Sequence, residues 1–290
     1  MGLDIGQALR EGASRTVAKN GLILAGLFAS IALLTTAMFQ TLSVALLDSA
    51  LSVVGAASPE ELGMSAAEYE EMIAEFETAS ETVRETSPLA LGLSAGAAFG
   101  GLVTIAILAE AVSIVAVRVF ASDEMGSIPS DLAAENILLA TLNGFVGKIV
   151  VWGLIILGSL FFLLPGLILA VLFYFLRQEI AIKDKNFVQA MADSWRLTKG
   201  HRIEVFLIGF VLVVVSRLEQ VSSAVFGLVS TTVGVLVAAA VGGLLAAFGA
   251  AVVTRAYVQI DDEAGEAIGA EPEAEKDPYD AALGADDLSR

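Results

Sequence analysis

Five stretches of the chain are mostly apolar and carry no charged side chain: 21–47, 89–109, 149–176, 205–216 and 221–254. A helix needs about 20 apolar residues to cross a hydrocarbon core about 30 Å thick. Strands of a membrane barrel would alternate polar and apolar residues over short segments, and these stretches do not alternate. The pattern therefore predicts an all-α fold, a polytopic helical bundle embedded in a membrane.

We expect six transmembrane helices, because Pro165 and Gly166 interrupt the third stretch and divide it into two spans. The expected spans are 21–47, 89–117, 146–164, 167–183, 203–217 and 231–256. The stretch 221–254 also has room for a short outer helix before the last span.

These spans define a membrane domain over 21–258, which follows an amphipathic helix over 1–20 and precedes an acidic tail over 259–290. The first apolar stretch is longer than the roughly 7–15 residues of a signal-peptide core, so we expect it to remain as a span. The tail has the composition of a disordered segment.

The formal net charge is −17, although 56% of the residues are hydrophobic and the mean hydropathy is +0.78. This balance argues against a nucleic-acid partner, because nucleic acids select for basic patches. The lipid bilayer is the partner that the pattern predicts. Acidic exposed segments in which Arg outnumbers Lys also indicate adaptation to a salt-rich cytoplasm, as in halophilic archaea.

The distribution of cations predicts the orientation, because short cytoplasmic loops carry an excess of Lys and Arg. The acidic loop 48–88 contains only Arg84, and we expect it to be extracellular. The other clusters then share one side, which places both termini in the cytoplasm of a multi-pass protein of the cell membrane. Those cations are Arg10, Arg15, Lys19, Arg118, Lys148, Arg177, Lys183, Lys185, Arg196, Lys199, Arg202 and Arg255.

The outer loop contains a second kind of helix. Ser65 and Glu68 form a capping-box pattern, and apolar residues then recur at helical spacing among glutamates. An amphipathic helix usually covers its own core, so we favour packing on the bundle over an external partner.

Polar-apolar helical segments at 3–19, 131–147 and 187–199 each precede a pair of spans, which suggests three diverged units of interfacial helix plus hairpin. The third segment begins at a good N-cap, Asn186, and Trp195 is the kind of ring that settles at headgroup depth. The residues expected to contact lipid headgroups are Trp195, Arg196, Lys199, His201 and Arg202.

The third segment also carries a family resemblance. LPG at 164–166, followed by a span, a charged turn and A-x-x-x-S-W-x-L-T-x-G at 190–200, resembles the membrane domain associated with glycerophosphoryl diester phosphodiesterases, in its stand-alone archaeal form. The strong similarity covers about 45 residues. It implies a polytopic membrane module without the catalytic barrel to which this domain is often fused, so the phosphodiesterase activity is not implied.

Glu110 is expected inside the second span, where a carboxylate is costly and is by default a candidate functional residue. A structural ion pair with Arg118 or Lys148 near the inner surface is the favoured interpretation. The alternative is a polar pocket open to the cytoplasm. That pocket would be formed by Glu110, Lys148, Arg177, Glu179 and Glu204.

Catalytic and metal-binding patterns are missing from the sequence. The chain has no cysteine and one histidine, His201, which makes a weak case for zinc. It has no Ser-His-Asp set, and Gly147-Lys148 lacks the spacing of a phosphate-binding loop. We therefore expect neither an enzyme nor a cofactor.

Small residues four apart predict close packing of helices. Gly92, Gly96 and Gly100 show this spacing in the second span, and Gly242 shows it with three alanines in the last span. We expect these two helices to pack on each other within the chain, with a dimer face as the alternative.

Together these features favour a non-catalytic scaffold or accessory protein that acts at the cytoplasmic membrane surface. The alternative is a carrier or permease for a small or lipid-like substrate. A polar cavity lined by a discontinuous helix would favour the carrier, whereas a core filled with small and aliphatic side chains would favour the scaffold.

Overall fold

The computed structural model describes residues 2–261, which form eleven helices and no strand. The helices are α1 (Ile5–Val17), α2 (Lys19–Ala56), α3 (Ala66–Thr86), α4 (Ala95–Ala121), α5 (Ser130–Ala134), α6 (Ile137–Phe161), α7 (Leu163–Leu172), α8 (Leu176–Lys183), α9 (Phe187–Leu197), α10 (Arg202–Gly227) and α11 (Thr231–Ile260). Six segments are long and apolar enough to cross a membrane: α2, α4, α6, α7 together with α8, α10 and α11. The expected all-α, six-span fold is therefore confirmed. The tail from 262 to 290 lies outside the described residues.

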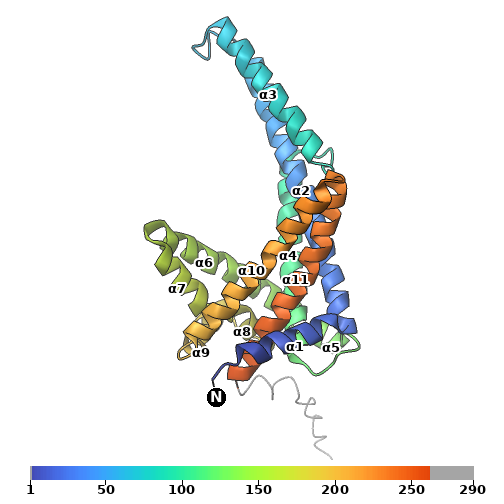
Figure 1. Ribbon diagram of the computed structural model, residues 1–290. Coiled ribbons are helices and arrows are strands. Elements are labelled where there is room, and N and C mark those ends of the chain that lie inside the picture. The colour runs from blue at the N-terminus through green and yellow to red at the C-terminus, as the bar shows by residue number, and fades with distance from the viewer. Residues whose placement is uncertain (1, 262–290) are drawn as a thin grey trace, which may run out of the picture.

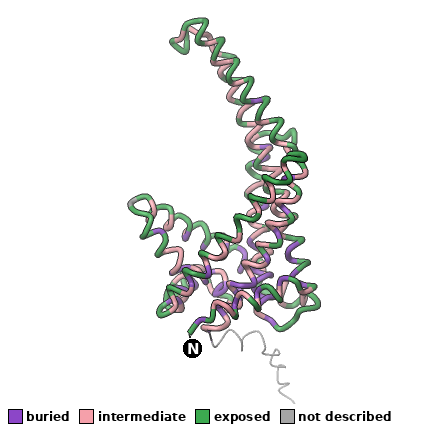
Figure 2. The backbone as a smooth tube through the Cα atoms, in the orientation of Figure 1, coloured by how far each residue is buried: buried purple, intermediate pink, exposed green. Residues whose placement is uncertain are grey.

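Four long helices, α2, α4, α10 and α11, form the main bundle, and the α6–α7 hairpin projects to one side of it (Figure 1). The short helices α1, α5, α8 and α9 gather at one end of the bundle. The N-terminus and the end of α11 lie at this same end, which we call the short-helix end. Figure 2 shows that most buried residues lie near it, whereas α3 and the tips of the hairpins are exposed.

Helix α1 docks on α11 without space for side chains between the two backbones. A Cβ at Gly12 would lie 2.9 Å from the backbone nitrogen of Val252. Arg255 donates to Glu11 at 2.6 Å, so an ion pair holds the same contact. The expected amphipathic N-terminal helix is therefore anchored to the last span.

The expected first span was too short at its C-terminal end, because α2 continues to Ala56. Its 38 residues would extend about 57 Å at the usual 1.5 Å rise. Helix α3 folds back along this extension, where Arg84 pairs with Asp48 at 2.7 Å and the Tyr69 hydroxyl donates to the Val54 carbonyl. The capping box at Ser65 is present. The outer helix thus packs on its own chain and forms an arm with α2 (Figure 1).

The prediction of a separate interfacial helix over 131–147 is wrong. Asn136 adopts a left-handed conformation that ends α5, and α6 then runs unbroken from Ile137 to Phe161. The short outer helix within 221–254 is also absent, because α10 continues to Gly227.

The first and third interfacial segments bury small residues at matching sequence positions. ALREG at 8–12 and AMADS at 190–194 place small residues on the buried faces of α1 and α9: Ala8, Gly12, Ala190 and Ser194. In α9, Ser194 also makes two hydrogen bonds: its hydroxyl donates to the Leu172 carbonyl and accepts from the Phe175 amide. Ser194 thereby satisfies backbone groups left open where the fourth span breaks between α7 and α8.

The glycine pattern of the second span does not mediate packing within the chain. Gly92 precedes α4, and a Cβ at Gly92, Gly96 or Gly100 would meet no atom within 4 Å. The two helices do pack on each other, with Phe120 of α4 and Ala247 of α11 in one buried cluster. Gly242, however, faces Glu219 of α10 rather than α4. The close approach is made by its neighbour Gly243, which contacts Ala25 and Ala29 of α2. Spacing alone did not reveal which helix would face each small residue.

The contact between α1 and α11 is expected to weaken in acid. Burial opposes ionisation of Glu11, but hydrogen bonds from Gln7 and Arg255 outweigh it and lower the pKa of this carboxyl. A lowered folded-state pKa gives a contribution that is complete above the ordinary carboxyl range and is lost as the pH falls through the lowered pKa. The protection factors of the α1 amides, which correct the exchange rates for the slower intrinsic exchange in acid, should therefore fall at acidic pH by up to about fivefold, the scale of a partly exposed ion pair.

The control is Glu11→Gln, in which α1 should exchange faster at neutral pH and lose this pH dependence. Equal pH dependence in the two proteins would assign the effect to another carboxyl.

Candidate functional site

One of the two carboxylates buried within the spans lies where α4 meets the start of α8. Glu110 is 1% exposed. Arg177 donates two hydrogen bonds to it, from Nε to Oε1 at 2.8 Å and from an Nη to Oε2 at 3.0 Å. Lys148 of α6 approaches the same carboxylate at 3.7 Å. We call these three residues the carboxylate cluster. Two cations and one carboxylate give it a net positive charge.

The break in the fourth span positions this cluster. Helix α7 ends at Leu172, and the backbone turns through Phe173–Phe175 before α8 begins. Arg118 fixes the other end of α8, because its Nε donates to the Ala181 carbonyl at 2.7 Å and an Nη donates to Asp184 at 3.0 Å. Arg118 is therefore a structural residue of this junction and does not pair with Glu110.

The five expected residues of the polar cluster do not all converge. Glu179 points to another side of α8, where it accepts from Lys185 at 2.6 Å and from the Tyr257 hydroxyl at 3.0 Å. The side chain of Glu204, in the first turn of α10, makes no hydrogen bond or ion pair within residues 2–261. Successive residues of a helix point in different directions, which is why Arg177 and Glu179 serve different groups.

The five expected headgroup residues lie together at the short-helix end, on α9 and the turn into α10 (Figure 1). Trp195 is half-exposed, and its ring packs edge-on against Phe173 with centroids 6.0 Å apart. Arg196, Lys199 and Arg202 are exposed, while His201 is half-buried. Arg196 is also held by Asp193.

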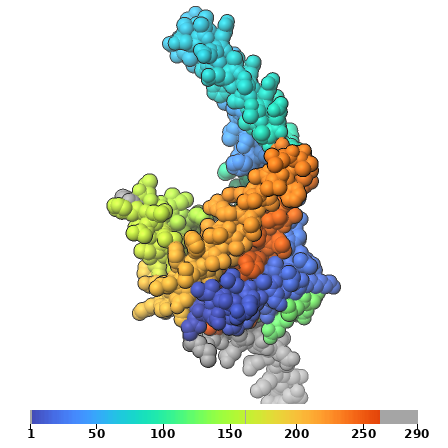
Figure 3. All heavy atoms as spheres, viewed as in Figure 1, coloured from blue at the N-terminus to red at the C-terminus, as the bar shows by residue number. Residues whose placement is uncertain are grey.

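An apolar cleft of about 610 Å³ opens between α7 and α10. Its lining includes Trp152, Leu167, Ala170, Phe206, Phe210 and Val213. Figure 3 shows the hairpin standing apart from α10 over part of its length. Trp152, Ala170 and Tyr174 also line a smaller cavity of about 210 Å³ that contains Glu110, Lys148 and Arg177. The apolar cleft therefore adjoins the cavity of the carboxylate cluster, with these shared residues between the two.

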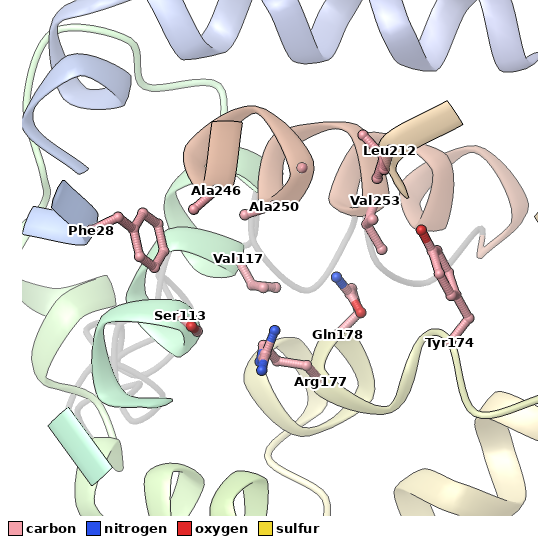
Figure 4. Close-up of a pocket in the computed structure, with 11 residues that line it drawn as sticks. Phe28, Ser113, Val117, Tyr174, Arg177, Gln178, Leu212, Ala246, Ala250 and Val253 are labelled. Atoms are coloured by element: carbon pink, nitrogen blue, oxygen red, sulfur yellow. The ribbon is translucent and has the colours of Figure 1, made fainter. Parts of the chain in front are cut away.

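A third cavity, of about 340 Å³, lies on the other side of Arg177 between α4, α8 and α11. We call it the polar pocket. Arg177, Gln178 and Tyr174 bring polar atoms to it (Figure 4). The sequence pattern alone did not single out Gln178 or Tyr174. Gln178 is an uncharged amide between Arg177 and Glu179 at the end of an apolar span, and this placement could have indicated it.

A family model described as a domain of unknown function, DUF7847, matches residues 3–260. The chain belongs to this family. The match covers all eleven helices, so in this DUF7847 chain the short-helix end, the spans and the α2–α3 arm belong to one unit. Neither the curated proteins nor the solved structures provide a match. The resemblance to the phosphodiesterase-associated membrane domain therefore stays a prediction.

Proposed function

We propose that this protein is a lipid-binding accessory protein of the cell membrane, without catalytic activity, whose short-helix end faces the cytoplasm. The observation that carries the proposal is the apolar cleft that lies beside a cavity lined by a positively charged cluster. A cleft of this kind suits an amphiphile, because the apolar chain of the amphiphile would lie in the cleft and its headgroup would meet Lys148 and Arg177. The acidic composition supports a salt-rich cytoplasm as its setting.

The exposure of the two cations supports this function. The side chain of Lys148 is 44% exposed and that of Arg177 is 36% exposed, whereas Glu110 is almost fully enclosed. The negative charge is therefore hidden while part of each cation stays accessible from the cavities. Unneutralised positive charge at this depth attracts anionic groups, because few other partners are available in lipid.

Ala170→Phe should remove bound lipid by filling the cleft. We expect purified wild-type protein in mild detergent to retain lipid through size-exclusion chromatography, and the variant to retain at least about tenfold less, as loss of a buried chain predicts. Native mass spectrometry would count the bound lipids. The matched control is Ile168→Phe, which adds the same ring on an exposed position of α7. Equal retention in all three proteins would refute the proposal.

A lipid carrier is the second candidate, and the discontinuous fourth span favours it. Broken spans often mark substrate pathways in carriers, because the freed backbone ends face a cavity. Reconstitution into vesicles that contain a fluorescent lipid separates the two. An accessory protein leaves the labelled lipid in its original leaflet, whereas a carrier exposes it to an external quencher.

A further inference from the structure

The polar pocket contains a buried amide group that has no hydrogen-bond partner in the protein. Gln178 is 4% exposed, its Oε1 atom is enclosed without a partner, and its Nε2 atom donates to no residue within 2–261. Figure 4 shows the amide nitrogen turned from α8 into the pocket, toward α11. Most buried polar side chains in proteins have a partner. The nitrogen therefore offers a donor to a ligand in the pocket.

Arg177 brings a second donor to the same pocket. Its bonds to Glu110 use Nε and Nη2, and the other terminal nitrogen, Nη1, makes no hydrogen bond within the part of the chain that the structure describes. The guanidinium and the Gln178 amide both reach the pocket from α8 and lie near each other there (Figure 4). Two neighbouring donors, one of them charged, match the two oxygens of a carboxylate.

The charge around the pocket favours a monovalent anion. Arg177 is the only charged residue among the described residues that line it. The nearby carboxylate of Glu110 is shared between Arg177 and Lys148, so these three residues together leave one positive charge. A ligand with one negative charge would complete the balance, whereas a divalent anion would keep an uncompensated charge in a buried site, which is costly.

The remaining walls of the polar pocket are apolar and leave free space. The α11 wall consists of Ala246, Gly249, Ala250 and Val253. A Cβ at Gly249 would meet only the side chain of Leu212, at 3.9 Å, so this glycine borders open space rather than a packed helix. A volume of about 340 Å³ lies in the range of small-molecule sites, and a halide ion would leave most of it empty. The walls therefore suit an anion with a hydrocarbon body.

We propose that the polar pocket binds a small organic carboxylate, whose oxygens accept from Arg177 and Gln178 and whose hydrocarbon body lies against α11. Gln178 and Gly249 line neither the apolar cleft nor the cavity of the carboxylate cluster. The inference therefore does not rest on the proposed lipid-binding function, and it adds a second ligand class at a separate site.

The test measures binding of butanoate by the full-length protein in nanodiscs of neutral lipid. Equilibrium dialysis against radiolabelled butanoate, with empty nanodiscs as the blank, should give saturable binding of one molecule per protein. Affinity should rise about fourfold per methylene group from acetate to butanoate, because each group is buried against the apolar walls. Butanamide has nearly the same shape without the charge, and it should compete at least about tenfold more weakly.

Gln178→Leu should weaken butanoate binding by about tenfold, the effect of one hydrogen bond to a charged group. The matched control is Gln220→Leu, which makes the same change at an exposed amide of α10 and should bind as the wild type does. The unfolding temperature of Gln178→Leu should not fall, because the substitution removes a polar group without a partner.

Gly249→Leu should abolish butanoate binding by filling the pocket. Its control is Gly26→Leu, which adds the same side chain at an exposed position of α2, where a Cβ would meet nothing within 4 Å. This second pair of variants tests the site by its volume and does not depend on the amide of Gln178.

Binding no higher than the blank, or unchanged binding in Gln178→Leu and Gly249→Leu, would overturn the carboxylate site. Displacement of butanoate by an equal concentration of chloride would overturn the choice of an organic anion. Ala170→Phe should leave butanoate binding unchanged and Gly249→Leu should leave lipid retention unchanged, so failure of this site and failure of the proposed function appear in different assays.

Discussion

Gly243→Ala is expected to destabilise the protein by about 3 kcal/mol, the upper end of the usual range for overpacking. The added methyl would lie 2.5 Å from the carbonyl oxygen of Ala25 and 2.5 Å from the amide nitrogen of Ala29. Both are backbone atoms of α2 and cannot move aside as a flexible side chain can. The helices α2 and α11 would have to separate along the contact that joins the first span to the last.

Gly26→Ala is the matched control for this substitution. It lies in the interior of α2, and its Cβ would meet nothing within 4 Å. There the higher helix propensity of alanine predicts a change between zero and a gain of about 1 kcal/mol. Thermal unfolding in one detergent, followed by circular dichroism, compares the two variants. If Gly243→Ala melts at the wild-type temperature, the close crossing of α2 and α11 is not present in solution.

The number and type of the spans could be predicted from the sequence because hydrophobic length is a local property. The stretches 21–47 and 221–254 are long, uncharged and without polar-apolar alternation, and such a segment spans lipid as a helix. Helix ends were harder to predict, since α2 continues past 47 to Ala56 along α3 and α6 begins nine residues before its expected start at 146. Both ends depend on contacts with distant segments or on a single left-handed residue, Asn136.

The candidate site could be predicted only in part for the same reason. Intramembrane charges identified Glu110, Lys148 and Arg177, because any charge in a span requires a partner. Periodicity could not show which face of α8 each residue occupies, since the break at Phe173–Phe175 resets the helical phase. Gln178 carries no charge and belongs to no motif, so only the shape of the cavity identifies it.

Glu110→Gln is expected to destabilise the protein by about 3 kcal/mol and to reveal what the carboxylate cluster does. Removing one member of a buried ion pair costs about 3–5 kcal/mol because the remaining charge is left without compensation. The partial exposure of Arg177 and Lys148 places this case at the lower end. Glu204→Gln, the same change at a carboxylate without an ion-pair partner within residues 2–261, should leave unfolding unchanged.

The double variant Glu110→Gln with Arg177→Gln should recover part of the stability lost in Glu110→Gln, because it removes the stranded guanidinium together with its partner. Unfolding of the wild type, the two single variants and the double variant gives a coupling free energy, which measures the interaction between Glu110 and Arg177. A coupling near zero would mean that Arg177 does not hold Glu110 in the membrane. A large coupling, together with unchanged lipid retention in Glu110→Gln, would assign the carboxylate to the stability of the α4–α8 junction and leave lipid binding to the cations.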